Sequence, residues 1–63
     1  MSIRQDLAYK AEELANQALS SKDPRIVQSI LQHLTGSIQS GAIEPYVGVP
    51  LVNPISQHLK QVE

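Results

Sequence analysis

The pattern of apolar, charged and proline residues changes at Gly41, and this change limits the folds that the chain can adopt. Before Gly41, apolar residues recur at steps of three and four residues, whereas the following segment, 42–53, is almost uncharged and contains Pro45 and Pro50. Steps of three and four residues are typical of amphipathic helices, but proline removes a backbone donor and disfavours a helix interior. The sequence therefore predicts a helical unit over residues 1–41 and a different structure after it.

Two helices are predicted within this first unit. A stripe that starts at Ile3 predicts a helix over about 2–20, and a second stripe that starts at Ile26 predicts a helix over about 24–40. Asp23 before Pro24 has the chemistry of an N-cap followed by a proline at the first helical position. Gly41 is expected to end the second helix in a left-handed conformation. A helical hairpin is the simplest result.

The apolar residues of the two stripes are expected to pack together, either within the hairpin or between copies of it. The predicted seam consists of Leu7, Ala11, Leu14, Ala18, Val27, Leu31, Leu34 and Ile38.

The segment 42–53 is predicted to be an extended arm. Val47, Val49 and Leu51 alternate with Gly48 and Pro50, and this period of two is typical of a strand or a polyproline-like stretch with one apolar side. Asn53-Pro54 then repeats the start signal Asp23-Pro24, so a short last helix is predicted over 54–63. The fold class predicted for the single small domain 1–63 is therefore all-α, a helical hairpin followed by an extended arm and a short C-terminal helix.

The small size of the chain predicts self-association. Chains of 63 residues are near the lower limit at which one hydrophobic core outweighs chain entropy, and the usual remedies are disulfides, metals or oligomerisation. The sequence has no cysteine, and charged residues make up only 17% of it. We therefore expect a homo-oligomer.

Charge and composition disfavour several classes of partner. The net charge is −1, so no positive field attracts nucleic acid or an anionic membrane surface. The turn between the two helices resembles that of a helix-turn-helix, but the second helix has one basic residue, Arg25. The start of the chain lacks the apolar region of a signal peptide, no stretch approaches the length of a membrane span, and the expected location is cytoplasmic.

No pattern of catalytic or metal-binding residues is found in the sequence. His33 and His58 both occur in the string Ile-x-Gln-His-Leu, and neither has a second His, Cys or carboxylate three or four residues away. The carboxylates fall where a solvated face or a cap is expected, and the serines lie in no nucleophile motif. The sequence therefore predicts a protein without enzymatic activity, metal or cofactor.

The predicted function is that of a small accessory or regulatory protein that self-associates and binds a partner protein through its apolar arm. An apolar arm cannot bury its side chains on itself, so it docks on its own hairpin, on a second copy or on another protein. The predicted partner-binding residues are Tyr46, Val47, Val49, Leu51 and Val52.

Two other functions remain open from the sequence. One is an oligomer that binds a small anion or nucleotide between subunits through basic groups such as Arg4, Lys10 and Arg25. The other is a DNA-binding regulator, which the low number of basic residues disfavours.

Overall fold

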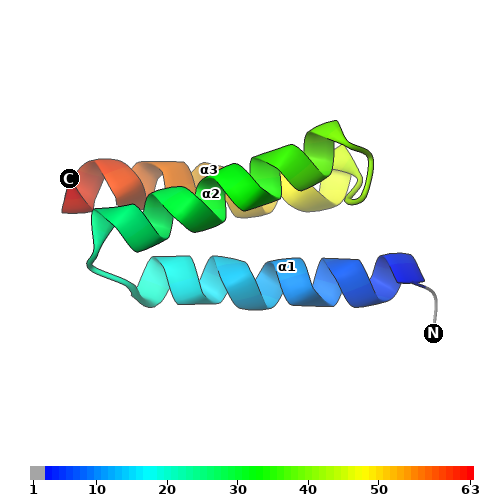
Figure 1. Cartoon of the computed structure of the whole chain (residues 1–63), viewed down its shortest axis with the longest axis horizontal. Coiled ribbons are helices and arrows are strands. Elements are labelled where there is room, and N and C mark those ends of the chain that lie inside the picture. The colour runs from blue at the N-terminus through cyan, green and yellow to red at the C-terminus, as the bar shows by residue number, and fades with distance from the viewer. Residues whose placement is uncertain (1–2) are drawn as a thin grey trace.

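The computed structural model describes the backbone of residues 3–63 and the side chains of residues 6–63. This part of the chain forms three helices, α1 (Ile3–Ser20), α2 (Pro24–Gln39) and α3 (Pro45–Val62), and has no strand. The helices run up, down and up, with α2 and α3 side by side above α1 in Figure 1. The all-α class is confirmed. The predicted start of the first helix at Ser2 lies outside the described residues.

The turn between α1 and α2 is closed by short-range hydrogen bonds. The backbone N–H of Arg25 donates to Asp23 Oδ1 over 2.9 Å, and the N–H of Asp23 donates to Ser21 Oγ over 3.1 Å. Pro24 takes the first helical position, where a missing amide costs nothing. The predicted N-cap is confirmed.

The turn after α2 depends on one glycine. Gly41 has a φ of +84°, in the left-handed region that only glycine enters without a steric penalty. Its N–H donates to Ile38 O over 3.1 Å, and the N–H of Ile43 donates to Ser37 O over 3.1 Å. The predicted left-handed cap is confirmed, and the turn carries Ile43 back into the core.

The predicted extended arm and short last helix are replaced by one long helix. Residues 45–53 form the first half of α3, and the helix continues through Pro50 and Pro54. Both prolines are exposed. The two backbone carbonyls that would accept from an N–H at positions 50 and 54 therefore lie on the solvent-exposed side of the helix. The apolar residues Val47, Leu51, Ile55 and Leu59 recur every four residues across the expected boundary. Burial of this stripe offsets the two lost hydrogen bonds, and the alternation that predicted an extended arm is incidental.

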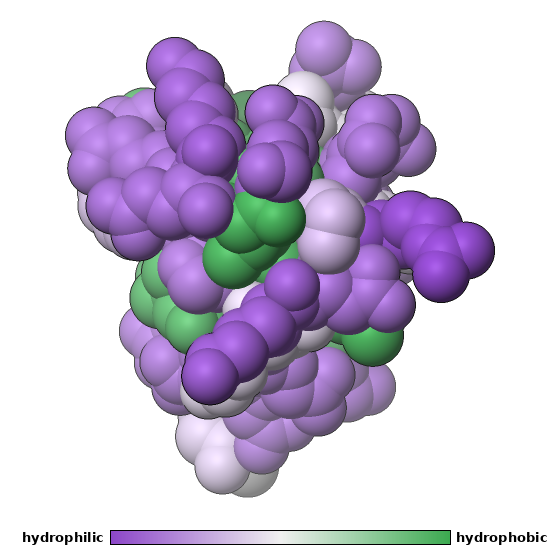
Figure 2. All heavy atoms as spheres, turned by 90° about the vertical axis from the view of Figure 1, so that its left-hand side faces the viewer, coloured by the Kyte–Doolittle hydropathy of each residue, from purple (hydrophilic) through white to green (hydrophobic). Residues whose placement is uncertain are grey.

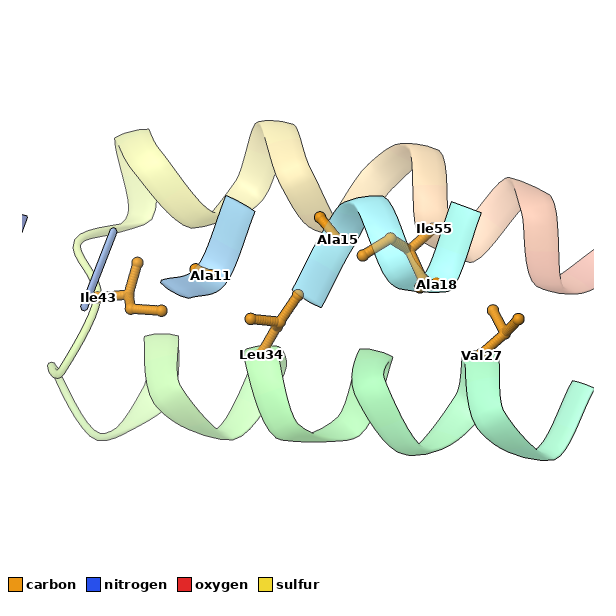
Figure 3. Close-up of a cluster of buried hydrophobic side chains, with 7 residues drawn as sticks. All are labelled: Ala11, Ala15, Ala18, Val27, Leu34, Ile43 and Ile55. Carbon is orange, nitrogen blue, oxygen red and sulfur yellow. The ribbon is translucent and has the colours of Figure 1, made fainter. Parts of the chain in front are cut away.

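The core is a short layer of aliphatic side chains between the three helices. Figure 3 shows its seven buried residues, with Val27 near one end and Ile43 near the other. Alanines supply the contribution of α1, whereas α2 and α3 supply branched side chains. The complete set is Ala11, Ala15, Ala18, Val27, Leu34, Ile43 and Ile55. Small residues on α1 allow the other two helices to approach it closely.

Helices α2 and α3 are in close contact where Gly48 meets Ile38. A Cβ atom at position 48 would lie 2.5 Å from both Cγ1 and Cδ1 of Ile38, and 3.3 Å from Cγ2 of Ile43. Any side chain at position 48 would therefore require Ile38 to shift. The contact also marks which residues of the two antiparallel helices lie at the same height (Figure 1).

Candidate functional site

The five predicted partner-binding residues do not form one surface. Tyr46 and Val49 are 76% and 45% exposed, on the outer side of α3. The other three, Val47, Leu51 and Val52, are partly buried and pack against the core. This division follows from the helix, because residues that alternate along an extended chain point in several directions around a helix.

The residues of the predicted seam lie mostly inside the three-helix bundle. Four of them are buried in the core, namely Ala11, Ala18, Val27 and Leu34. Leu14, Leu31 and Ile38 are partly buried and pack against that core, and Leu7 is half-buried. Within one chain, α3 covers much of the apolar surface that the hairpin would otherwise expose.

The most distinctive surface is an uncharged strip on α2 and α3. From Ile26 to Leu59 the sequence has a single charged residue, Glu44. The exposed residues of this strip include a stripe of amides on α2 and a stripe on α3 that combines amides with Tyr46 and Val49. We call these residues the amide face; they are Gln28, Gln32, Gln39, Tyr46, Val49, Asn53 and Gln57.

Helix geometry places the members of each stripe together. Gln28, Gln32 and Gln39 are separated by four and seven residues, and Tyr46, Val49 and Asn53 by three and four, so each set lies on one side of its helix. Because α2 and α3 pack against each other, the two stripes lie on neighbouring helices. The sequence shows that the second helix after Arg25 and the segment 42–53 are almost free of charge. It does not show that the two lie on neighbouring helices, because the segment is predicted to be an extended arm.

The hydroxyl groups near the end of α2 are engaged within their own helix. Thr35 Oγ1 donates to Leu31 O over 2.8 Å, and Ser37 Oγ donates to His33 O over 3.0 Å. Such bonds satisfy the hydroxyl locally. The hydroxyls of Thr35 and Ser37 are therefore less available to another molecule than the exposed amides of α2.

Two of the basic residues proposed for the anion site are paired locally and lie far apart along the bundle. Lys10 Nζ lies 4.0 Å from Asp6 Oδ2, and Arg25 Nε lies 3.8 Å from Asp23 Oδ1. Lys10 lies about 15 Å along α1 from the turn beside Arg25, at 1.5 Å per residue. The structure does not bring these two members of the predicted anion site together, and the side chain of Arg4 lies outside the described residues.

The two histidines occupy different environments despite their similar local sequence, Ile-x-Gln-His-Leu. His58 Nε2 lies 2.6 Å from the carbonyl oxygen of Ser21, so the ring donates a hydrogen bond that joins α3 to the turn between α1 and α2. His33 is exposed on α2. Among the described residues, no group of three or more His, Cys, Asp or Glu side chains is arranged to hold a metal ion.

The end of the bundle near the C-terminus is mainly hydrophilic. Figure 2 shows hydrophilic side chains around this end, with separate hydrophobic patches between them. Two exposed large hydrophobic residues, Leu19 and Ile26, lie on either side of the α1–α2 turn. Scattered apolar residues of this kind are normal on a protein surface, and we do not assign a site to them.

No helix within the described residues is long and apolar enough to cross a membrane. Comparison of the chain with known proteins finds no matching family model, no matching curated protein and no matching solved structure.

Proposed function

We propose that this protein is a non-catalytic interaction module that binds protein chains through the amide face. The observation that carries the proposal is that the stretch 26–59, which holds the whole amide face, contains one charged residue, Glu44, whereas the rest of the chain carries both signs of charge. A surface that faces only water gains solubility from charged residues. A surface that becomes buried against another protein is expected to be depleted of them.

The chemistry of the amide face supports this role. Removal of a charged group from water is costly unless it is paired, whereas an amide needs only a donor and an acceptor from the partner. Tyr46 supplies a large apolar body with a polar tip, and tyrosine is enriched among residues that dominate binding energy. Val49 lies three residues away and extends the apolar contact along α3.

The test is a double substitution on this face, Tyr46→Asp with Val49→Asp. Both residues are exposed, so we expect the variant to keep its helical circular dichroism spectrum. In an extract of the cells that express the protein, the wild-type chain is expected to elute in a complex larger than one chain, and the variant as a single chain. Val49→Asp with Leu51→Asp is a poor test, because Leu51 packs against the core.

Tyr9→Asp is the matched control. Tyr9 is 61% exposed on α1, and it lies among charged residues rather than on the amide face. We expect this variant to stay in the complex. Elution of the wild-type protein as a single chain, or equal loss of the complex in the control, would contradict the proposed function.

A further inference from the structure

We infer that the partner of the amide face is a second copy of this chain, bound about a two-fold axis that passes near Gln32 and Asn53. The inference rests on the proposed function, and it identifies the partner that the face fits. Three features carry it: the chemistry of the exposed side chains, the register of α2 and α3, and the size of the side of the bundle on which the face lies.

The chemistry of the face is self-complementary. In a two-fold symmetric pair the same patch is present on both sides of the interface, so any charged residue near the axis meets its own copy. A face without charge avoids this repulsion. An interface between two different proteins, in contrast, commonly places a positive patch on one protein against a negative patch on the other. Each glutamine or asparagine amide carries both donors and an acceptor, so a row of amides is able to bond to an identical row.

The register of the helices places two amides at the centre of the face. Gly48 packs against Ile38, and α2 and α3 run in opposite directions (Figure 1). Gln32 lies six residues before Ile38 on α2. On α3, which runs the other way, Pro54 lies six residues after Gly48, and Asn53 is its neighbour. Since both helices rise by the same amount per residue, exposed Gln32 and Asn53 lie at about the same height, midway along the uncharged strip.

The amide face lies along one long side of the bundle, and that whole side has about the area that a dimer needs. The molecule measures 36 × 19 × 16 Å, so one long side offers roughly 600–700 Å², close to the ~800 Å² per partner of a standard interface. The net charge of −1 gives little long-range repulsion between copies. A dimer through this face would pack α2 and α3 of one copy on α2 and α3 of the other.

A charge placed at Gln32 tests the inference. For the wild-type protein, sedimentation velocity over a wide dilution series is expected to show a reversible dimer. Gln32→Glu places a new carboxylate beside its own copy, so we expect the dissociation constant to rise by at least about tenfold. Gln17→Glu is the matched control, because it makes the same change at an exposed glutamine of α1, and it is expected to leave the dissociation constant within about twofold.

A mixing experiment isolates the role of the second copy. Gln32→Glu and Gln32→Lys chains are each expected to dimerise more weakly alone than the wild type, and to form a tighter mixed dimer together, because opposite charges then meet near the axis. A wild-type protein that is monomeric at every concentration overturns the inference, as does equal weakening by Gln17→Glu, or failure of the mixed pair to associate. If the pure protein is monomeric but the Tyr46 and Val49 variant still loses a complex in cell extract, the proposed function stands and the partner is another protein.

Discussion

Ile38 occupies the space that a side chain at position 48 would need. At the residue scale, the three glycines of this chain have different roles. Gly48 permits close approach of α3 to α2, and Gly41 adopts a left-handed conformation. At Gly36, no atom other than its chain neighbours and its own helix backbone lies within 4 Å of the place where a Cβ would lie. Substitution by alanine should therefore give three different results.

Gly48→Ala is expected to destabilise the protein by about 1–2 kcal/mol, as is typical of overpacking. The new Cβ would meet two atoms of Ile38, which is branched at Cβ and is held between the helices. Gly36→Ala is the control, and it should stabilise the protein by about 0.5–1 kcal/mol, because alanine is the better helix former. Urea unfolding of the two variants measures both changes. An increase in stability for both would contradict the close contact at Gly48.

Gly41→Ala is expected to cost about 1–2 kcal/mol, because a Cβ is strained in the left-handed conformation. The strain is local, since nothing lies within 4 Å of the new atom. Gly41→Asn should cost less than Gly41→Ala, because asparagine tolerates this conformation better than other residues. Thermal unfolding followed by circular dichroism gives the order of the three proteins. An alanine variant as stable as the wild type would show that Gly41 does not have a positive φ.

At the element scale, α3 is the unusual helix because it contains Pro50 and Pro54 in its interior. A proline inside a helix costs about 3 kcal/mol relative to alanine. The helix forms because its apolar stripe is buried against α1 and α2, and because both prolines are exposed. Tertiary packing therefore overrides local preference along this segment.

Pro50→Ala and Pro54→Ala are each expected to stabilise the protein by about 1–3 kcal/mol and to raise its helical circular dichroism signal slightly. Each change restores a backbone donor on the exposed side of α3 without disturbing the core. Urea unfolding at equal protein concentration is the measurement. A loss of stability on both changes would instead support an extended conformation, in which proline limits the freedom of the unfolded chain.

The sequence predicts the features of the fold that depend on local signals, but not those that depend on packing between helices. Asp23, Pro24 and Gly41 are local signals, and the structure uses them as predicted. The effect of Pro50 depends on which side of a helix it occupies, and that is known only once the helix has a neighbour. This outcome also divides the predicted contact residues, because Tyr46 and Val49 are exposed while Leu51 is partly buried against the core.

At the scale of the whole molecule, the bundle is small and its surface is large. Its accessible surface of 4446 Å² exceeds the roughly 4,000 Å² expected for a monomer of this mass. Proteins of this length have about 3–9 kcal/mol of stability in total. A single long-range interaction is therefore a sizeable fraction of the stability of the fold.

The hydrogen bond from His58 to Ser21 is such an interaction, because it joins residues 37 positions apart in the chain. We expect His58→Ala to destabilise the protein by about 0.5–1.5 kcal/mol, the usual net contribution of one hydrogen bond. His33→Ala is a control in the same local sequence, Ile-x-Gln-His-Leu. Since His33 is exposed and alanine is the better helix former, this variant should be as stable as the wild type or slightly more so.

Thermal unfolding of the two histidine variants gives the comparison directly. For a domain of this size a change of 1 kcal/mol shifts the midpoint by about 4–8 °C, so the two variants should be well separated. Amide hydrogen exchange should also become faster at the C-terminal end of α3 in the His58 variant, because that end is held to the α1–α2 turn by this bond. Equal midpoints would mean that packing of Leu59 and Val62 against the core is sufficient to hold the end of the helix, and that the imidazole contributes nothing to the closure of the bundle.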